Sequence, residues 1–173
     1  MNQCRFCELI EKKFGVVYED EKTMAMLHPT PCAPGHIVIM PRKHYPIMEQ
    51  VPDYVVGDLF TKANKISIAL FEGLGAEGTN IFVQNGAAAG QKQNHFMVHI
   101  IPRKQNDGLP LTWRPKQLSE EEMSTIELKV KEEAKSVGVF EKEKEKPIEE
   151  EKPEELKPGK EEDYRLKHLE RVP

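Results

Sequence analysis

The sequence predicts an α+β protein. Three observations lead to this fold class: several short apolar segments with the composition of strands, one long segment with apolar residues at helical spacing, and a second helical segment near residue 120. The strands and helices do not alternate regularly along the chain. A doubly wound α/β architecture is therefore not favoured, and the pattern indicates an α+β arrangement.

The first elements are short. Residues 4–13 place Phe6, Leu9 and Ile10 on one side of a helix, and residues 16–19 and 23–27 are strand candidates. Residues 36–40 read HIVIM and follow the turn-forming segment PTPCAPG, so we expect a buried strand there.

The later elements are longer. Residues 54–71 form an amphipathic helix, because apolar residues recur every three or four positions: Val55, Leu59, Ala63, Ile66 and Leu70. Residues 80–84 (NIFVQ) predict a strand, and the loop NGAAAGQKQN leads into another strand at residues 95–102. Ser119 and Glu122 have the spacing of a capping box, which opens a helix that runs to residue 137.

Charge divides the chain into a domain and a tail. The 33 residues from 141 to 173 contain 12 acidic and 9 basic side chains, whereas residues 1–140 have the composition of an ordinary globular domain. Residues 141–163 have too few apolar side chains to offset the entropy of folding, so we expect a disordered charged linker. Residues 164–173 regain apolar side chains, which is consistent with either a docking segment or a frayed terminus.

Several classes of protein are excluded. No apolar stretch approaches the ~20 residues that a membrane span requires, and the N-terminus lacks the features of a signal peptide. Three cysteines are too few for a disulfide framework, and we expect a cytoplasmic protein. The balanced charge of residues 1–140 argues against strong non-specific binding of nucleic acid.

The expected strand at residues 95–102 carries the candidate chemistry. Because side chains alternate along a strand, His95, Met97 and His99 share one face, and the intervening residues Phe96 and Val98 are available for the core. Two histidines on one face after a glycine-rich loop form a candidate site. A purely structural role for both is the alternative.

The motifs around this strand resemble those of the histidine-triad (HIT) family of nucleotide-binding proteins. Residues 90–103 match G-Q-x-x-x-H-x-H-x-H-I-I-P-R except at the middle histidine, which is Met97. Residues 31–44 resemble the family segment P-x-A-P-G-H-x-L-V-I-P-K-x-H, and Cys4-Arg-Phe-Cys7 resembles the opening of many members. Together these motifs cover residues 4–103.

The resemblance implies a HIT-like fold with an antiparallel sheet, assembled as a homodimer. It also implies hydrolysis or transfer of nucleotidyl groups through a covalent intermediate on the middle histidine. The thioether of Met97 has no titratable proton and little nucleophilicity toward phosphorus, so we expect weak or no turnover by this route. His99 is retained in a supporting catalytic role. Cys32 lies in the turn before residue 36, and nothing in the sequence brings it to the position of Met97.

The resemblance also assigns a nucleotide pocket. The residues that it implies are Phe6 and Leu9 along the base, and Gln84, Gly90, Gln91, Lys92 and His99 near the phosphates. His28 stands where the family has an acidic residue that holds the ribose hydroxyls, and Lys92 replaces a small hydroxyl residue. These two departures predict altered specificity for a mononucleotide or a nucleotide-derived small molecule.

A structural zinc ion is the expected cofactor. In relatives with the cysteine pair, the ligands correspond to Cys4, Cys7, His44 and His95, a closed set of four. Reduced thiols without a metal are the alternative. A soft copper site formed by His95, Met97 and His99 is a weaker alternative, since zinc already accounts for His95.

Three functional hypotheses follow. The first is a nucleotide-binding HIT protein with weak or no hydrolase activity, and the second is an active nucleotide hydrolase or nucleotidyl transferase that uses a modified mechanism. The third is a dimeric structural or interaction protein that acts through its charged tail.

Overall fold

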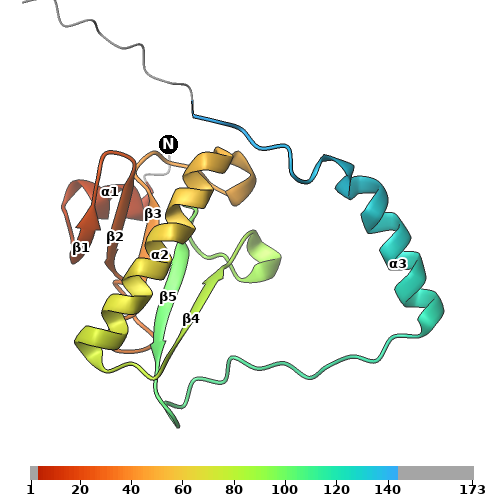
Figure 1. Cartoon of the computed structure of the whole chain (residues 1–173). Helices are drawn as coiled ribbons and strands as arrows, with labels where there is room; N and C mark the ends of the chain where they lie inside the picture. Colours follow the sequence, from red (N-terminus) through yellow and green to blue (C-terminus); the bar gives the residue numbers. More distant parts are fainter. Residues whose placement is uncertain (1–3, 144–173) are drawn as a thin grey trace, which may run out of the picture. The chain divides into compact units, whose positions relative to one another are not determined.

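A five-stranded antiparallel sheet forms the centre of the protein, and its strands lie in the order β1-β2-β3-β5-β4 (Figure 1). A computed structural model describes residues 4–143. The strands are β1 (Val16–Glu19), β2 (Thr23–Leu27), β3 (Ile37–Pro41), β4 (Gly78–Val83) and β5 (Val98–Arg103). The expected α+β class with an antiparallel sheet is confirmed.

Three α-helices accompany the sheet: α1 (Arg5–Glu11), α2 (Asp53–Leu74) and α3 (Glu120–Glu133). The helix α2 ends where Gly75 adopts a left-handed conformation with φ of 59°, which glycine accommodates without steric cost. The helix α3 begins with the predicted capping box, because Ser119 and Glu122 exchange side-chain and backbone hydrogen bonds. Both predicted long helices are therefore present.

The two faces of the sheet bury different sets of residues. Ile39 and Val98 face α2, where they pack with Leu59, Ala63 and Leu70. The opposite face packs against α1 through sulfur-containing and apolar side chains: Phe6, Ile10, Met24, Met26, Val38, Met40 and Met97. The alternation of side chains along each strand produces this division, and it confirms that Phe96, Val98 and Ile100 belong to the core.

The helix expected to run to residue 137 ends at Glu133, and the predicted start of the last strand is also wrong. The strand expected at residues 95–102 begins only at Val98. This first residue of β5 pairs with Val83, the last residue of β4. Before that point the backbone follows a loop, in which the Phe96 N–H donates to the Tyr45 carbonyl at 2.6 Å. His95 and Met97 therefore precede the strand, whereas His99 lies within it.

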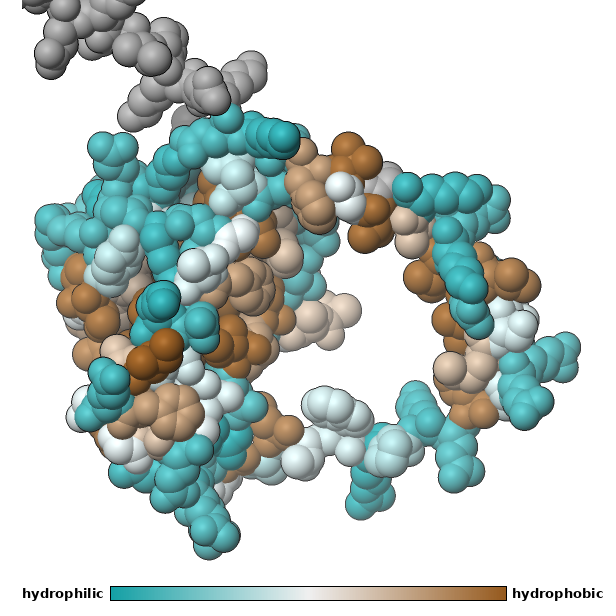
Figure 2. All heavy atoms as spheres, in the orientation of Figure 1, coloured by the Kyte–Doolittle hydropathy of each residue, from teal (hydrophilic) through white to brown (hydrophobic). Residues whose placement is uncertain are grey.

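The apolar side of α3 is exposed. Met123, Ile126 and Val130 lie on this side, and none of the residues of α3 is buried. Figure 2 shows brown, apolar atoms exposed along this helix. Within residues 4–143, none of the helices has a stretch apolar enough to span a bilayer. The expected linker at 141–163 lies outside the described residues beyond position 143, as does the whole segment 164–173.

Candidate functional site

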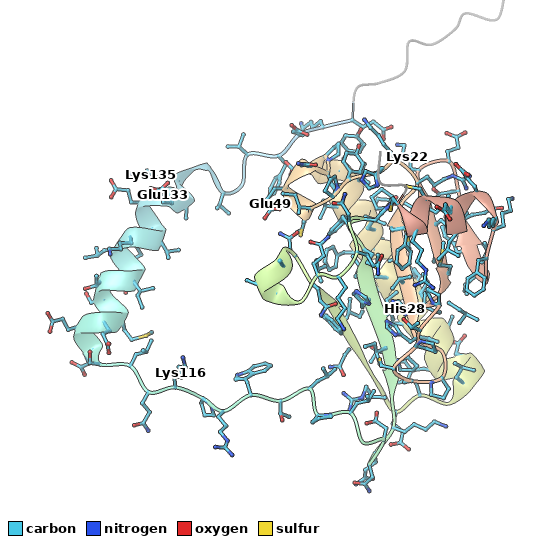
Figure 3. All side chains as sticks on the ribbon, turned by 180° about the vertical axis from the view of Figure 1, so that it is seen from behind. Lys22, His28, Glu49, Lys116, Glu133 and Lys135 are labelled. Carbon is cyan, nitrogen blue, oxygen red and sulfur yellow. The ribbon has the colours of Figure 1, made fainter. Side chains whose placement is uncertain are left out.

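A cavity of about 370 Å³ lies on the sheet face opposite α2. The view from behind shows His28 on this face (Figure 3). The principal polar and sulfur-containing side chains of the lining are His28, Cys32, His36, Gln84, Lys92, Met97 and His99. The volume is within the usual range for small-molecule sites, and the lining combines imidazoles with one cationic side chain.

Imidazole rings form one wall of the cavity. The ring of His28 is parallel to that of His36, with centroids 4.5 Å apart and an interplanar angle of 1°. The ring of His99 stacks on Phe82 at 5.2 Å and lies 5.3 Å from His36. His36 lies between the rings of His28 and His99, and His99 lies between those of His36 and Phe82. These ring contacts restrict rotation of the His36 and His99 side chains.

The hydrogen bonds of His36 define its tautomer. Its Nδ1 accepts the Cys32 backbone N–H at 3.3 Å, so this nitrogen carries the lone pair in the neutral ring. The proton of neutral His36 is then on Nε2, which lies 3.1 Å from Nδ1 of His99. It follows that His36 donates to His99, and that the remaining proton of neutral His99 is on Nε2.

Burial favours the neutral forms of both rings. Desolvation lowers the pKa of His36 to about 4, and the neighbouring His28 and His99 lower it further. Desolvation likewise lowers the pKa of His99 to about 4, with His28 adding to the effect. At neutral pH the two rings therefore act as a chain of neutral donors and acceptors.

The glycine-rich loop is held by its own side chains. Gln91 Oε1 accepts the Gly86 N–H at 2.7 Å, and Gln91 Nε2 donates to the carbonyl oxygens of Pro46 and Gln93 at 2.7 and 2.8 Å. Gly90 has φ of 87°, and a Cβ there would lie 2.8 Å from Nε2 of Gln84. The positive φ favours glycine here, and a larger residue would also have to displace the flexible end of Gln84. These two residues shape the loop. Both amide hydrogens of Gln91 are engaged, whereas its Oε1 retains a second lone pair.

The expected pocket residues divide into two groups. Gln84, Lys92, Met97 and His99 line the cavity together with Gln91. Phe6 is buried in the core beside Met97, with its ring 6.1 Å from that of His28, and Leu9 packs against the same cluster. Neither of these α1 residues is part of the cavity lining. Phe6 therefore lies behind the imidazole wall, next to His28, and Leu9 packs against the apolar cluster to which Phe6 belongs.

A second cluster brings together Cys4, Cys7, His44 and His95, whose candidate ligand atoms all lie within 4.8 Å of one another. Nδ1 of His95 lies 3.6 Å from Sγ of both cysteines, and Nδ1 of His44 lies 3.4 Å from Sγ of Cys7. Nε2 of His95 lies 2.9 Å from the Pro41 carbonyl, which can only accept. The proton of His95 is therefore on Nε2, and its Nδ1 lone pair faces the thiols.

These distances fit a tetrahedral ion. With Zn–S near ~2.3 Å and Zn–N near ~2.0 Å, a tetrahedral angle separates sulfur from nitrogen by about 3.5 Å. Burial raises the pKa of the Cys7 thiol to about 11, and the hydrogen bond to Cys4 acts in the same direction. Metal binding would therefore displace a proton from this thiol. The bond from His95 to Pro41 is the kind of outer contact that orients a metal ligand.

Several lining residues are not predicted by the sequence, and the two with reactive side chains are His36 and Cys32. His36 was noted only as part of a motif, although it contacts both Cys32 and His99. Cys32 was set aside because it lies in a turn. The pairing of Val38 with His99 between β3 and β5 is what brings these side chains together, and no local sequence pattern reveals that register.

The protein is therefore of the α+β class: α2 covers one face of the sheet, and the other face carries an imidazole-lined cavity of the size of small-molecule sites. A sequence model of the HIT domain matches residues 10–106, so the chain belongs to the HIT family. It is 41% identical over 110 residues to "Adenylylsulfatase HINT3" of Arabidopsis thaliana, a match that covers 62% of this chain and 56% of that protein. It is 34% identical over 92 residues to the asymmetrical bis(5′-nucleosyl)-tetraphosphatase of Schizosaccharomyces pombe, covering 53% of this chain and 50% of the relative.

Solved structures agree with this assignment. A HIT family protein from Bacillus subtilis superposes with a TM-score of 0.70 at 28% identity, covering 76% of this chain and 96% of the other. A Zn-bound histidine triad family protein from Mycobacterium smegmatis superposes with a TM-score of 0.59 at 28% identity, covering 75% and 97%. The chain spans about half the length of the two curated relatives, and nearly all of both solved structures.

The buried imidazoles predict a pH dependence of stability. His36 and His99 have pKa values of about 4 in the folded protein, against ~6.5 for an exposed imidazole. The unfolded chain therefore binds more protons between these values, and the free energy of unfolding falls as the pH decreases from about 6.5 toward 4. Nitrogen NMR of the two rings checks this directly. Titration of both near pH 6.5 would contradict it.

Proposed function

We propose that the protein binds the nucleoside monophosphate part of a nucleotide-derived small molecule in the cavity. The observation that carries the proposal is the convergence of Lys92 and His99 on one imidazole-lined cavity. Lys92 supplies positive charge, and neutral His99 presents an N–H, so together they offer complementary partners for phosphate oxygens. The names of both curated relatives refer to nucleotide substrates, which supports this class of ligand.

His28 changes how a ribose would be held. Its Nδ1 lies 2.8 Å from the Thr30 carbonyl, which leaves Nε2 as the nitrogen able to meet a ligand hydroxyl. One imidazole nitrogen contacts one hydroxyl, whereas a carboxylate accepts from two. We therefore propose a weaker preference for ribose over deoxyribose than an acidic residue at this position would produce.

Met97 removes the imidazole nucleophile from this cavity. The side chain is 7% exposed and packs with Phe6 and Val38, so it fills space as an apolar group. A thioether cannot accept and release a proton during attack on phosphorus. We therefore propose that transfer through position 97 contributes nothing to turnover.

The substitution Met97→His tests this proposal. We expect the variant to hydrolyse adenosine 5′-phosphoramidate at least about 100-fold faster than the wild type, because a nucleophile is restored beside His99. Calorimetric titration should show that both proteins bind AMP with similar affinity. Failure of the wild type to bind AMP even at millimolar concentration would refute the proposed function.

We propose that Cys4, Cys7, His44 and His95 hold a structural zinc ion. The tetrahedral spacing of the donors supports this, as does the Zn-bound relative from Mycobacterium smegmatis. Two cysteines and two histidines complete a four-coordinate shell and leave no position for substrate. The ion would tie α1 to the loop before β5.

The free thiols also fit the reducing conditions of the cytoplasm, where we propose that the protein resides.

Elemental analysis of protein purified without added metal is expected to find close to one zinc per chain. Cys7→Ser should lose the metal and lower the melting temperature, since the ion stabilises only the folded state. Cys32→Ser is the matched control, because it removes a thiol outside the cluster and should retain zinc. Equal melting temperatures for wild type and Cys7→Ser would argue against the site.

We also propose that the chain forms a homodimer through α2 and the edge strand β4. The side of α2 that does not face the core exposes Phe60, Ile68 and Phe71, which recur at helical spacing. β4 ends the sheet, and its Ile81 is also exposed. An apolar stripe beside an unpaired strand edge is a surface that a second copy would cover.

Replacing Phe71 with Asp should convert the dimer to a monomer, because the carboxylate would be buried without a partner. Lys65→Asp introduces the same side chain on another side of α2 and is expected to leave the dimer intact. Analytical ultracentrifugation measures both. A wild-type protein that is monomeric at micromolar concentrations would refute the proposal.

A further inference from the structure

The turn before β3 places a thiol in the cavity. Cys32 is exposed, lines the cavity, and lies with Sγ 3.5 Å from Nδ1 of His36. That nitrogen carries the lone pair of the neutral ring, and the Cys32 thiol and backbone N–H share it as their acceptor. A nucleophile within reach of a base that is itself held by a third group is the arrangement of covalent catalysis. Here the third group is His99.

A separate observation points from His99 toward a ligand. This side chain is only 8% exposed and lines the cavity, while its Nδ1 is occupied by His36. Among the hydrogen bonds of residues 4–143, none involves Nε2 of His99, which bears the proton. Because no fully buried side-chain nitrogen or oxygen of the described residues lacks a partner, this N–H is accessible and can donate to a ligand or water. The hydrogen-bonded row from Cys32 through His36 to His99 thus ends at the Nε2–H of His99, which faces the cavity.

We propose that Cys32 is the nucleophile of this cavity and acts on the α-phosphorus of nucleoside 5′-phosphoramidates or phosphoanhydrides. The proposal rests on the proposed nucleotide-binding function and deepens it. The nucleophile, which Met97 cannot supply, is then Cys32, from the turn before β3.

In the first step, Sγ of Cys32 attacks the α-phosphorus while its proton passes to Nδ1 of His36. The Nε2 proton of His36 moves to Nδ1 of His99, and the Nε2 proton of His99 moves to the leaving group. An S–P bond forms and the bond from phosphorus to the leaving nitrogen or oxygen breaks. The products are a nucleotidyl-cysteine and the protonated leaving group, and both rings remain neutral.

In the second step, water attacks phosphorus and gives its proton to Nε2 of His99. The row of protons shifts back through His36, and the Cys32 sulfur leaves with a proton from Nδ1. The nucleoside monophosphate is released and the original tautomers are restored. No oxidant, reductant or metal enters either step.

Another hydroxyl–imidazole pair borders the cavity and is the competing candidate. Oγ1 of Thr30 lies 3.3 Å from Nδ1 of His28. That nitrogen also lies 2.8 Å from the Thr30 carbonyl and accepts the Thr30 backbone N–H at 3.1 Å, much as Nδ1 of His36 accepts that of Cys32. A thiol also loses its proton far more readily than an alcohol. The two contacts are similar in geometry, and the chemistry of the thiol favours Cys32.

The test uses the full chain, adenosine 5′-phosphoramidate and a denaturing quench followed by intact mass measurement. We expect the wild type to gain the mass of one adenylyl group, mapped by peptide sequencing to Cys32. Cys32→Ser should lose this adduct and lower kcat at least about 30-fold, while its calorimetric affinity for AMP changes less than about threefold. Combining Cys32→Ser with Met97→His should restore a covalent adduct, now at position 97, which shows that the variant is folded.

The outcomes separate the two proposals. If the wild type does not bind AMP, the nucleotide-binding function and the role of Cys32 both fail. If the wild type binds AMP but forms no adduct, or if Cys32→Ser turns over like the wild type, only the assignment of Cys32 is overturned. Loss of turnover in Thr30→Val but not in Cys32→Ser would also overturn it, in favour of the competing pair.

Discussion

The antiparallel pairing of β3 with β5 is the constraint on which the cavity depends. It sets Val38 opposite His99 and Ile37 opposite Ile100. Because side chains alternate, Ile37 and Ile100 face α2 while Val38 and His99 face the other way. The same register brings His36, just before β3, within hydrogen-bond distance of His99. A slip of one residue would exchange the core and cavity faces, so the site cannot change register without unpacking the core.

The residues around β5 separate two kinds of chemistry. His95 lies in the loop before the strand and turns toward the cysteines of α1, with its other nitrogen held by Pro41. His99 lies in the strand and turns toward the cavity. Met97 stands between them, where it packs against Phe6. His95 belongs to both sites, because it is one of the candidate metal ligands and also lines the cavity beside Met97.

The cavity also depends on interactions that hold its loop and turn. Gln91 secures the glycine-rich loop through hydrogen bonds to three backbone groups and thereby shapes the cavity that it lines. The backbone N–H of Cys32 selects the tautomer of His36, and burial keeps the pKa of that ring near 4. Because His36 and His99 are both neutral, and the N–H of His36 points to the lone pair of His99, protons can shift from Cys32 through the two rings without creating a buried charge.

The α+β class followed from the sequence alone, because apolar periodicity is a local property. The resemblance of local motifs to the HIT family implied the antiparallel sheet and the four potential metal ligands. The capping box of α3 was equally readable, since its two residues are three apart. The tertiary structure decided that β5 begins at Val98, that Phe6 lies behind the imidazole wall, and that Cys32 reaches His36. Each of these depends on which strands pair and in what register, a choice made by packing between residues far apart in the chain.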